Sequence, residues 1–177
     1  MTLRYFPIIP VLASLAGGCL FDVQADIPDV DITQHGVKVP GVPHSEGIGD
    51  VSANTSFTFS SANTAWAKHM NSQVLARQVT ITATGGLADL DFVKTVRVTI
   101  SDPATTKEAT ELISYERCDE EPSSSVIEGN MPEPIDITPL WSADQTVIWL
   151  ALGGRLPEED WTVDVTLKVG GKITYKY

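Results

Sequence analysis

Short runs of alternating apolar and polar residues cover most of the chain from residue 51 to its end. Val79, Ile81 and Ala83, for example, alternate with threonines, and this run stops at Gly85-Gly86. Further runs lie at residues 57–60, 96–100, 111–117, 161–168 and 173–177. Alternation with period two places successive side chains on opposite faces of a strand, and many such runs between turn residues are typical of a sandwich. The pattern predicts an all-β fold with a single antiparallel, immunoglobulin-like β-sandwich over residues 51–177.

Two segments depart from simple alternation. Residues 146–152 (TVIWLAL) are apolar on both faces, which predicts a central strand covered on both sides. Residues 63–76 are rich in helix formers, and Trp66, Met70 and Val74 lie four residues apart on one helical face. We therefore expect one short helix or crossover in the second segment.

The last two runs are separated by Gly170-Gly171, which suggests a hairpin. A two-residue turn would pair apolar residues with polar ones across the two strands. A three-residue loop over residues 169–171 would instead pair Leu167 with Ile173. We therefore predict the longer loop.

The N-terminus has the organisation of a secretory signal. A short start that contains Arg4 precedes an apolar run at residues 5–16, and two small residues lead to Cys19. The apolar run is shorter than the roughly 20 residues that a membrane-spanning helix needs. We therefore predict a signal peptide over residues 1–18.

The end of this signal, residues 15–19 (LAGGC), resembles the lipobox of bacterial lipoproteins, although Ala16 stands at the usual Leu position. The resemblance implies that the chain is cleaved before Cys19 and that Cys19 carries acyl chains such as palmitate. An alternative is cleavage after Ala25 by an ordinary signal peptidase, which would release a soluble secreted protein.

The segment that follows Cys19 is acidic and rich in proline and glycine. This composition predicts an extended tether over residues 19–50, with one possible edge strand at residues 30–39. The whole chain is also acidic, since 12 Lys and Arg face 23 Asp and Glu for a net charge of −11. Such a surface disfavours binding to nucleic acid and electrostatic docking on anionic lipid.

Catalytic and metal-binding motifs are absent from the sequence. It contains no G-x-S-x-G, Walker, H-E-x-x-H or G-x-G-x-x-G motif, and its histidines are His35, His44 and His69. The acidic clusters do not match the spacing of an EF-hand, so a solvated acidic surface is the favoured interpretation. Cys118 precedes three acidic residues, which disfavour its thiolate. We expect no catalytic residue, metal or cofactor.

The four tryptophans are Trp66, Trp141, Trp149 and Trp161. Trp149 and Trp161 lie in strong strand patterns, which favours core packing. Trp141 follows Pro139 and precedes a loop, so it is the best candidate for an exposed ring that contacts a ligand.

The signal, the acidic tether and the single β-domain together resemble small envelope lipoproteins of Gram-negative bacteria, notably those of myxobacteria. The resemblance implies a lipid anchor in the cell envelope, and Leu20 in place of an aspartate after the cysteine favours the outer membrane. We expect a non-enzymatic interaction or structural module with an envelope protein or glycan as partner. The alternative is a carbohydrate-binding module that uses Trp141. A hydrolase ranks lower because no nucleophile–base pair can be named.

Overall fold

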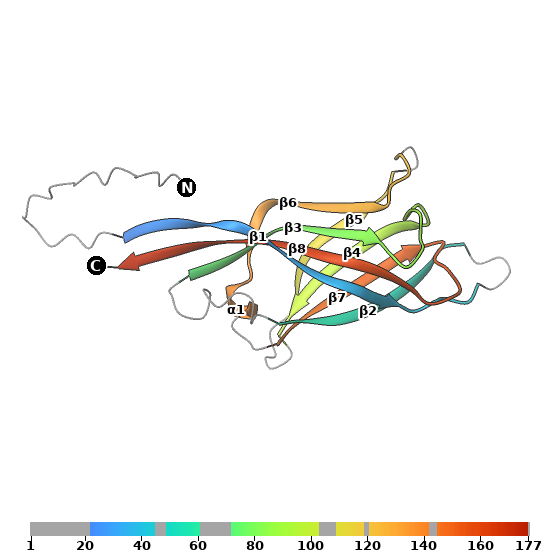
Figure 1. Cartoon of the computed structure of the whole chain (residues 1–177), viewed down its shortest axis with the longest axis horizontal. Helices are drawn as coiled ribbons and strands as arrows, with labels where there is room; N and C mark the ends of the chain where they lie inside the picture. Colours follow the sequence, from blue (N-terminus) through green and yellow to red (C-terminus); the bar gives the residue numbers. More distant parts are fainter. Residues whose placement is uncertain are drawn as a thin grey trace, which may run out of the picture.

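The computed structural model describes residues 22–44, 49–60, 72–102, 109–118, 121–141 and 145–176. Within these ranges the chain forms two antiparallel four-stranded sheets that pack as two layers (Figure 1). Sheet A contains, in spatial order, β1 (Asp22–Val39), β8 (Trp161–Lys176), β3 (Ser72–Ala83) and β6 (Val126–Asp136). Sheet B contains β2 (Val51–Ser60), β7 (Gln145–Gly154), β4 (Val93–Ser101) and β5 (Thr110–Glu116). The predicted all-β sandwich is therefore confirmed.

The strand order defines the kind of sandwich. Strand β1 pairs with β8, β2 with β7, β3 with β6 and β4 with β5, as if one long hairpin had been rolled up. This nested pairing in two four-stranded sheets is the jelly-roll arrangement. The expected immunoglobulin-like topology is wrong, because that fold divides its strands differently and does not pair the first strand with the last in this way.

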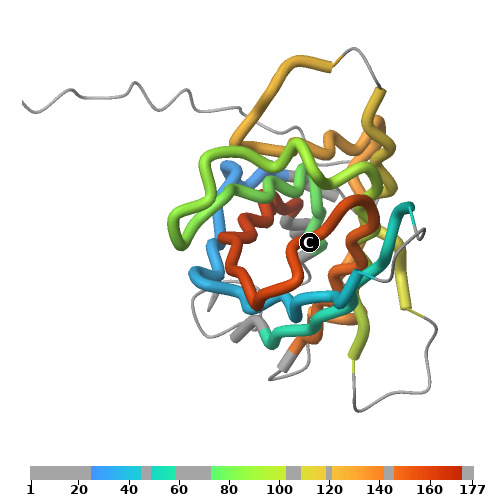
Figure 2. The backbone as a smooth tube through the Cα atoms, turned by 90° about the vertical axis from the view of Figure 1, so that its right-hand side faces the viewer, coloured from blue at the N-terminus to red at the C-terminus, as the bar shows by residue number. Residues whose placement is uncertain are grey.

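One core of buried side chains fills the space between the sheets. Figure 2 shows the backbone of the sandwich seen from one end. As expected, the apolar residues of the alternating runs form this core. Val96, Val98 and Ile100 of β4, for example, are all buried. On β8, the inward set starts at Trp161 and continues at every second residue to Val169. Because period-two alternation assigns a strand's faces without knowledge of its partner, these inward sets were predictable from the sequence.

Strand β1 occupies much of the segment expected to be a tether. The possible edge strand at residues 30–39 is present, but β1 begins earlier, at Asp22, and is paired with β8 along its length. The sheet therefore starts well before residue 51, the expected domain boundary. Aspartates of β1 lie opposite lysines of β8, as in the pairs Asp26↔Lys172 and Asp31↔Lys168, and opposite charges across a ladder favour this register.

The expected hairpin at Gly170-Gly171 does not exist, because β8 runs straight through both glycines. Leu167 lies opposite Ile32 on one side and Val79 on the other, so it is not paired with Ile173. Gly170 instead leaves space on the outer face of sheet A. The ion pair between Asp29 of β1 and Arg77 of β3 passes over this glycine, with Asp29 Oδ1 2.9 Å from Arg77 Nε.

The expected helix over residues 63–76 is wrong in its last part and lies otherwise outside the described residues. Residues 72–76 belong to strand β3, where Val74 is buried in the core. Among the described residues, a short helix is found instead at α1 (Thr138–Trp141), shortly after β6. It is held in place because Thr138 Oγ1 accepts a hydrogen bond from the Val74 N–H at 2.7 Å.

Gly36 marks a bulge in β1 where the ladder with β8 shifts register. Its φ of 62° lies in the left-handed region that favours glycine. The Gly36 N–H donates to Asp164 Oδ1 at 2.8 Å, and His35 Nδ1 lies 2.6 Å from Asp164 Oδ2. The Gly36 hydrogen bond is the main cause that lowers the pKa of Asp164, and the His35 contact is the next.

The first prediction concerns the edge where the two sheets touch. A Cβ at Gly129 of β6 would lie 2.5 Å from Cδ1 and 3.0 Å from Cβ of Ile113 on β5. Gly129→Ala should therefore lower the free energy of unfolding by about 1–3 kcal/mol in urea titrations, because the sheets must separate locally. A Cβ at Gly49 meets nothing within 4 Å, so Gly49→Ala is the control, expected within about 0.5 kcal/mol of wild type. Equal effects of the two substitutions would contradict this packing.

The second prediction concerns pH. Because the pKa of Asp164 is lower in the folded state than its ordinary value of 3.8, its contribution to stability is present above that value. The contribution disappears as the pH falls through the folded-state pKa. Asp164→Asn should cost about 1 kcal/mol near pH 7 and progressively less below pH 4, measured as urea midpoints across the pH range. A constant difference down to pH 2 would contradict this assignment. Glu128→Gln, an exposed change opposite Thr80 at the sheet edge, is the control.

Candidate functional site

Trp149 lies on the outer face of sheet B and is the main surprise among the tryptophans. Its neighbours Ile148 and Leu150 point into the core, whereas Trp149 is 49% exposed. The expectation that it packs in the core is therefore wrong, and so is the expectation that β7 is covered on both faces. Strand β7 is central within its sheet, but a two-layer sandwich covers only one face of each sheet.

The Trp149 ring is held by a polar neighbour on the adjacent strand. Its indole Nε1 donates a hydrogen bond to Ser101 Oγ of β4 at 3.2 Å. The register places Ser56 of β2 and Thr99 of β4 directly beside it. The ring is thus an apolar surface in a defined position, surrounded by hydroxyl groups.

Many small polar side chains share this outer face with Trp149. Alternation along β2, β4 and β5 directs these hydroxyl and amide residues outward: Ser52, Asn54, Ser56, Thr58, Thr95, Thr99, Ser101 and Ser114. Such side chains both donate and accept hydrogen bonds. With Trp149 they combine one aromatic surface with many hydrogen-bonding groups.

A shallow hollow of about 280 Å³ lies farther along the same face. Its floor contains Ala151 and Gly153 of β7, and Thr95 and Arg97 of β4 line its side. A Cβ at Gly153 would lie 2.4 Å from Thr95 Oγ1, so glycine keeps this floor low. Arg97 is the cationic side chain at the hollow, and its Nε forms an ion pair with Glu111 of β5. We call Trp149, this hollow and the polar residues between them the sheet B surface.

Trp141 does not form part of this surface. It lies in α1, is 2% exposed and packs in the core cluster. The expectation of an exposed Trp141 is wrong, because the one-turn helix folds it and Leu140 against the end of the sandwich. An indole buried to this degree offers no face to a ligand. Trp161 is 7% exposed, which confirms its expected core position, and Trp66 lies outside the described residues.

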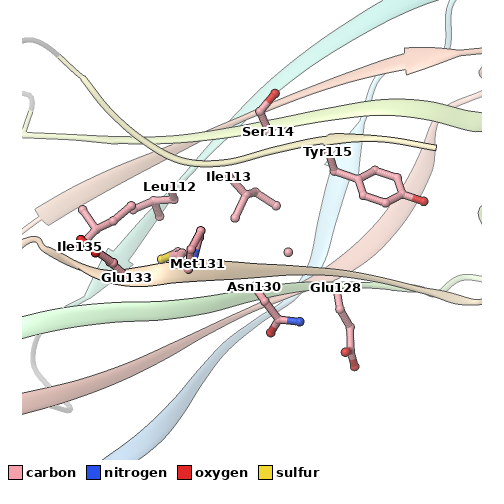
Figure 3. Close-up of a pocket in the computed structure, with 11 residues that line it drawn as sticks. Leu112, Ile113, Ser114, Tyr115, Glu128, Asn130, Met131, Glu133 and Ile135 are labelled. Carbon is pink, nitrogen blue, oxygen red and sulfur yellow. The ribbon is translucent and has the colours of Figure 1, made fainter. Parts of the chain in front are cut away.

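A second hollow, of about 310 Å³, lies between the edge strands β5 and β6 (Figure 3). Ile113 points across it toward β6, whereas Glu128 and Asn130 point away. Tyr115 at its end donates a hydrogen bond to Glu121 Oε2 at 2.7 Å. Burial and this hydrogen bond raise the pKa of Tyr115 to about 12, so the phenol is neutral. The inside of this hollow is apolar, and the Tyr115 hydroxyl at its end is already hydrogen-bonded to Glu121.

The described histidines lie away from the sheet B surface. His35 contacts Asp164 on sheet A, and His44 Nε2 lies 2.6 Å from the Leu156 carbonyl oxygen. Within the described ranges, no three His, Cys, Asp or Glu side chains converge in a way that could hold a metal ion. Cys118 is an exposed free thiol, and Cys19 lies outside the described residues. In the part of the chain with described structure, no helix has the length and apolar character needed to cross a membrane.

Sequence reasoning missed the sheet B surface because both sets of alternating residues in β7 are apolar. Ile148, Leu150 and Leu152 form one set, and Val147, Trp149 and Ala151 form the other. The outward set can be recognised because its neighbours Ser56 and Thr99 on the adjacent strands are polar. This criterion can be applied only when the register of β2 and β4 against β7 is known.

Comparisons with known proteins give only distant structural similarities. No protein-family model matches the chain, and no curated protein matches it. Among solved structures, that of Desmodium yellow mottle tymovirus aligns with a TM-score of 0.38 and 10% identity over 95% of each chain. The decameric BFDV capsid protein aligns with a TM-score of 0.39 and 8% identity, over 86% of this chain and 99% of the other.

Proposed function

We propose that the protein is a non-enzymatic binding module, anchored in the cell envelope through acylated Cys19, that binds a neutral glycan chain on the sheet B surface. The observation that carries the proposal is the half-exposed Trp149, fixed by Ser101 among outward-facing hydroxyl residues. The carbohydrate hypothesis therefore moves from Trp141 to Trp149.

The chemistry of the sheet B surface matches that of a sugar ring. The apolar C–H face of a sugar packs on an aromatic ring, while its hydroxyl groups exchange hydrogen bonds with serine, threonine and asparagine side chains. Trp149 and Gly153 are four residues apart on β7, about 13 Å at the rise of a strand. This span favours a chain of sugars over a single unit. The net charge of −11 disfavours anionic polysaccharides, so a neutral chain fits best.

The anchor rests on the lipobox-like residues 15–19, and the position of β1 is compatible with it. Strand β1 begins at Asp22, three residues after Cys19, so an extended link spans about 10 Å at most. Cleavage after Ala25 would remove the four residues of β1 that pair with Ile173, Thr174, Tyr175 and Lys176 of β8. Cleavage before Cys19 keeps the whole strand, which favours it as the processing site.

The glycan proposal predicts that Trp149→Ala weakens binding. In affinity electrophoresis through gels that contain neutral polysaccharides (dextran, mannan or a mixed-linkage β-glucan), wild type should be retarded by at least one of them. Trp149→Ala should lose about tenfold in affinity, or 1.4 kcal/mol, because the stacking surface is gone. Val30 is an equally conspicuous exposed apolar residue, at 41% exposure, but lies on β1. Val30→Ala is therefore the matched control, and equal retardation of all three proteins would contradict the proposal.

The anchor proposal predicts a change of cell fraction. Wild type should sediment with membranes, because each buried methylene of an acyl chain contributes about 0.8 kcal/mol. Cys19→Ala should no longer be acylated, and cleavage after Ala25 should then release it into the soluble fraction. The intact mass of wild type from native membranes should show a chain that starts at Cys19 and carries acyl groups. A soluble wild-type chain that starts at Asp26 would refute the anchor and leave the glycan proposal intact.

A further inference from the structure

A third hollow lies at the end of the sandwich where β3 and β7 end and β8 begins. It has a volume of about 340 Å³, comparable to a small-ligand pocket. Its walls come from the β3–β4 connection, with Thr84 and Leu87, and from residues 157–162 around the start of β8. This end is opposite the one where β1 begins and β8 ends (Figure 1). We call it the loop-end pocket.

Trp161 supplies the unusual group of the loop-end pocket. It lines the pocket, is 7% exposed, and packs edge-on against Phe92 with ring centroids 5.2 Å apart. Its indole Nε1 is buried but has no hydrogen-bond acceptor among the described residues. A buried donor without an acceptor is costly, and native proteins rarely keep one without a reason. A ligand with an acceptor atom would satisfy this N–H once a side chain of the pocket wall moves aside to uncover it.

Three further polar side chains of the loop-end pocket are held in place by the fold. Thr84 Oγ1 donates to Thr162 Oγ1 at 3.1 Å, and Asp160 Oδ1 accepts the Gly41 N–H at 2.9 Å. A Cβ at Gly85 would lie 2.6 Å from Thr162 Oγ1, and its φ of 67° requires glycine. The positions of both threonine hydroxyls and of the Asp160 carboxylate are therefore fixed before a ligand arrives.

The chemistry of this lining selects one class of ligand. Glu159 and Asp160 are acceptors that repel anions, and no lysine or arginine is among the residues that line the pocket. The Trp161 N–H requires an acceptor, whereas the carboxylates require donors. A hydroxyl group meets both requirements, and Leu87 and Pro157 provide an apolar wall for the carbon skeleton.

From this arrangement we infer that the loop-end pocket binds a single neutral polyhydroxylated molecule, a monosaccharide or polyol, whose hydroxyl oxygen accepts the Trp161 indole N–H. This site is separate from the sheet B surface, since Trp149 is not among its lining residues. The inference holds whether or not the sheet B surface binds glycan chains.

The test uses the indole N–H resonances of the ¹⁵N-labelled protein. Glycerol, mannitol and the methyl glycosides of glucose, galactose and mannose are titrated to about 100 mM, which saturates a site with a millimolar Kd. At least one of them should shift the Trp161 indole signal in a saturable manner, while the Trp149 signal stays in place. Trp161→Phe and Trp149→Phe each remove one signal and thereby assign both. A Trp161 signal that stays unchanged with all five compounds would overturn the inference.

Two variants separate ligand binding from packing. Trp161→Phe keeps a ring against Phe92 but removes the unpaired N–H. The substitution should therefore lower the Tm of the protein no more than a conservative core substitution does. Its affinity for the bound compound, measured by calorimetry, should drop at least tenfold. Glu159→Gln, an exposed change beside it, should weaken binding by a smaller factor. Unchanged affinity in Trp161→Phe would overturn the role of the N–H, whereas Trp149→Phe should bind the compound as wild type does.

Discussion

The antiparallel pairing of the first strand with the last is the constraint on which the remaining structure depends. Once β1 lies beside β8, the chain between them must fold back on itself, and β2 with β7, β3 with β6 and β4 with β5 follow as nested pairs. Most of these contacts join residues far apart in the sequence. Loop closure therefore costs conformational entropy before the burial of side chains stabilises the fold. Side-chain contacts therefore have to define the register of β8 on both sides.

Several of those contacts are visible around β8. The bulge at Gly36 aligns its N–H with Asp164, and Gly170 allows Asp29 and Arg77 to meet across the strand. On the inner face, every second residue of β8 from Trp161 to Val169 enters the core. A shift by one residue would bring Asp164 inside and expose its apolar neighbours, which strongly disfavours any other register.

The sequence predicted the faces of the strands but not their partners. Alternation placed Val163 and Val165 in the core, because burial of one face is a local property of a strand. It could not reveal that Gly170 lies within a strand, since the same glycine pair is also a hairpin signal. Strand β6 was missed because Pro132 and Pro134 suggest a loop, although an edge strand tolerates them. Which of Trp141 and Trp149 is exposed depended on long-range packing.

An exposed tryptophan alone is ordinary on a protein surface. What distinguishes Trp149 is that its ring is fixed by Ser101 and lies next to a hollow whose floor is kept low by Gly153. A fixed ring loses little conformational entropy on binding, so more of its contact energy contributes to affinity. The surrounding serines and threonines are short, and short side chains likewise lose little entropy.

The short link between Cys19 and β1 gives the proposed anchor a mechanical consequence. A tether over residues 19–50 would have let the domain rotate freely above a membrane, with an orientation averaged over a flexible chain. With β1 paired from Asp22, an acylated Cys19 would hold the start of β1 and the end of β8 near the lipid. The loop-end pocket then faces away from the bilayer, and the sheet B surface stands at the side of the domain. A chain lying across that surface and a small ligand at the tip could be bound together, since neither site would block the other.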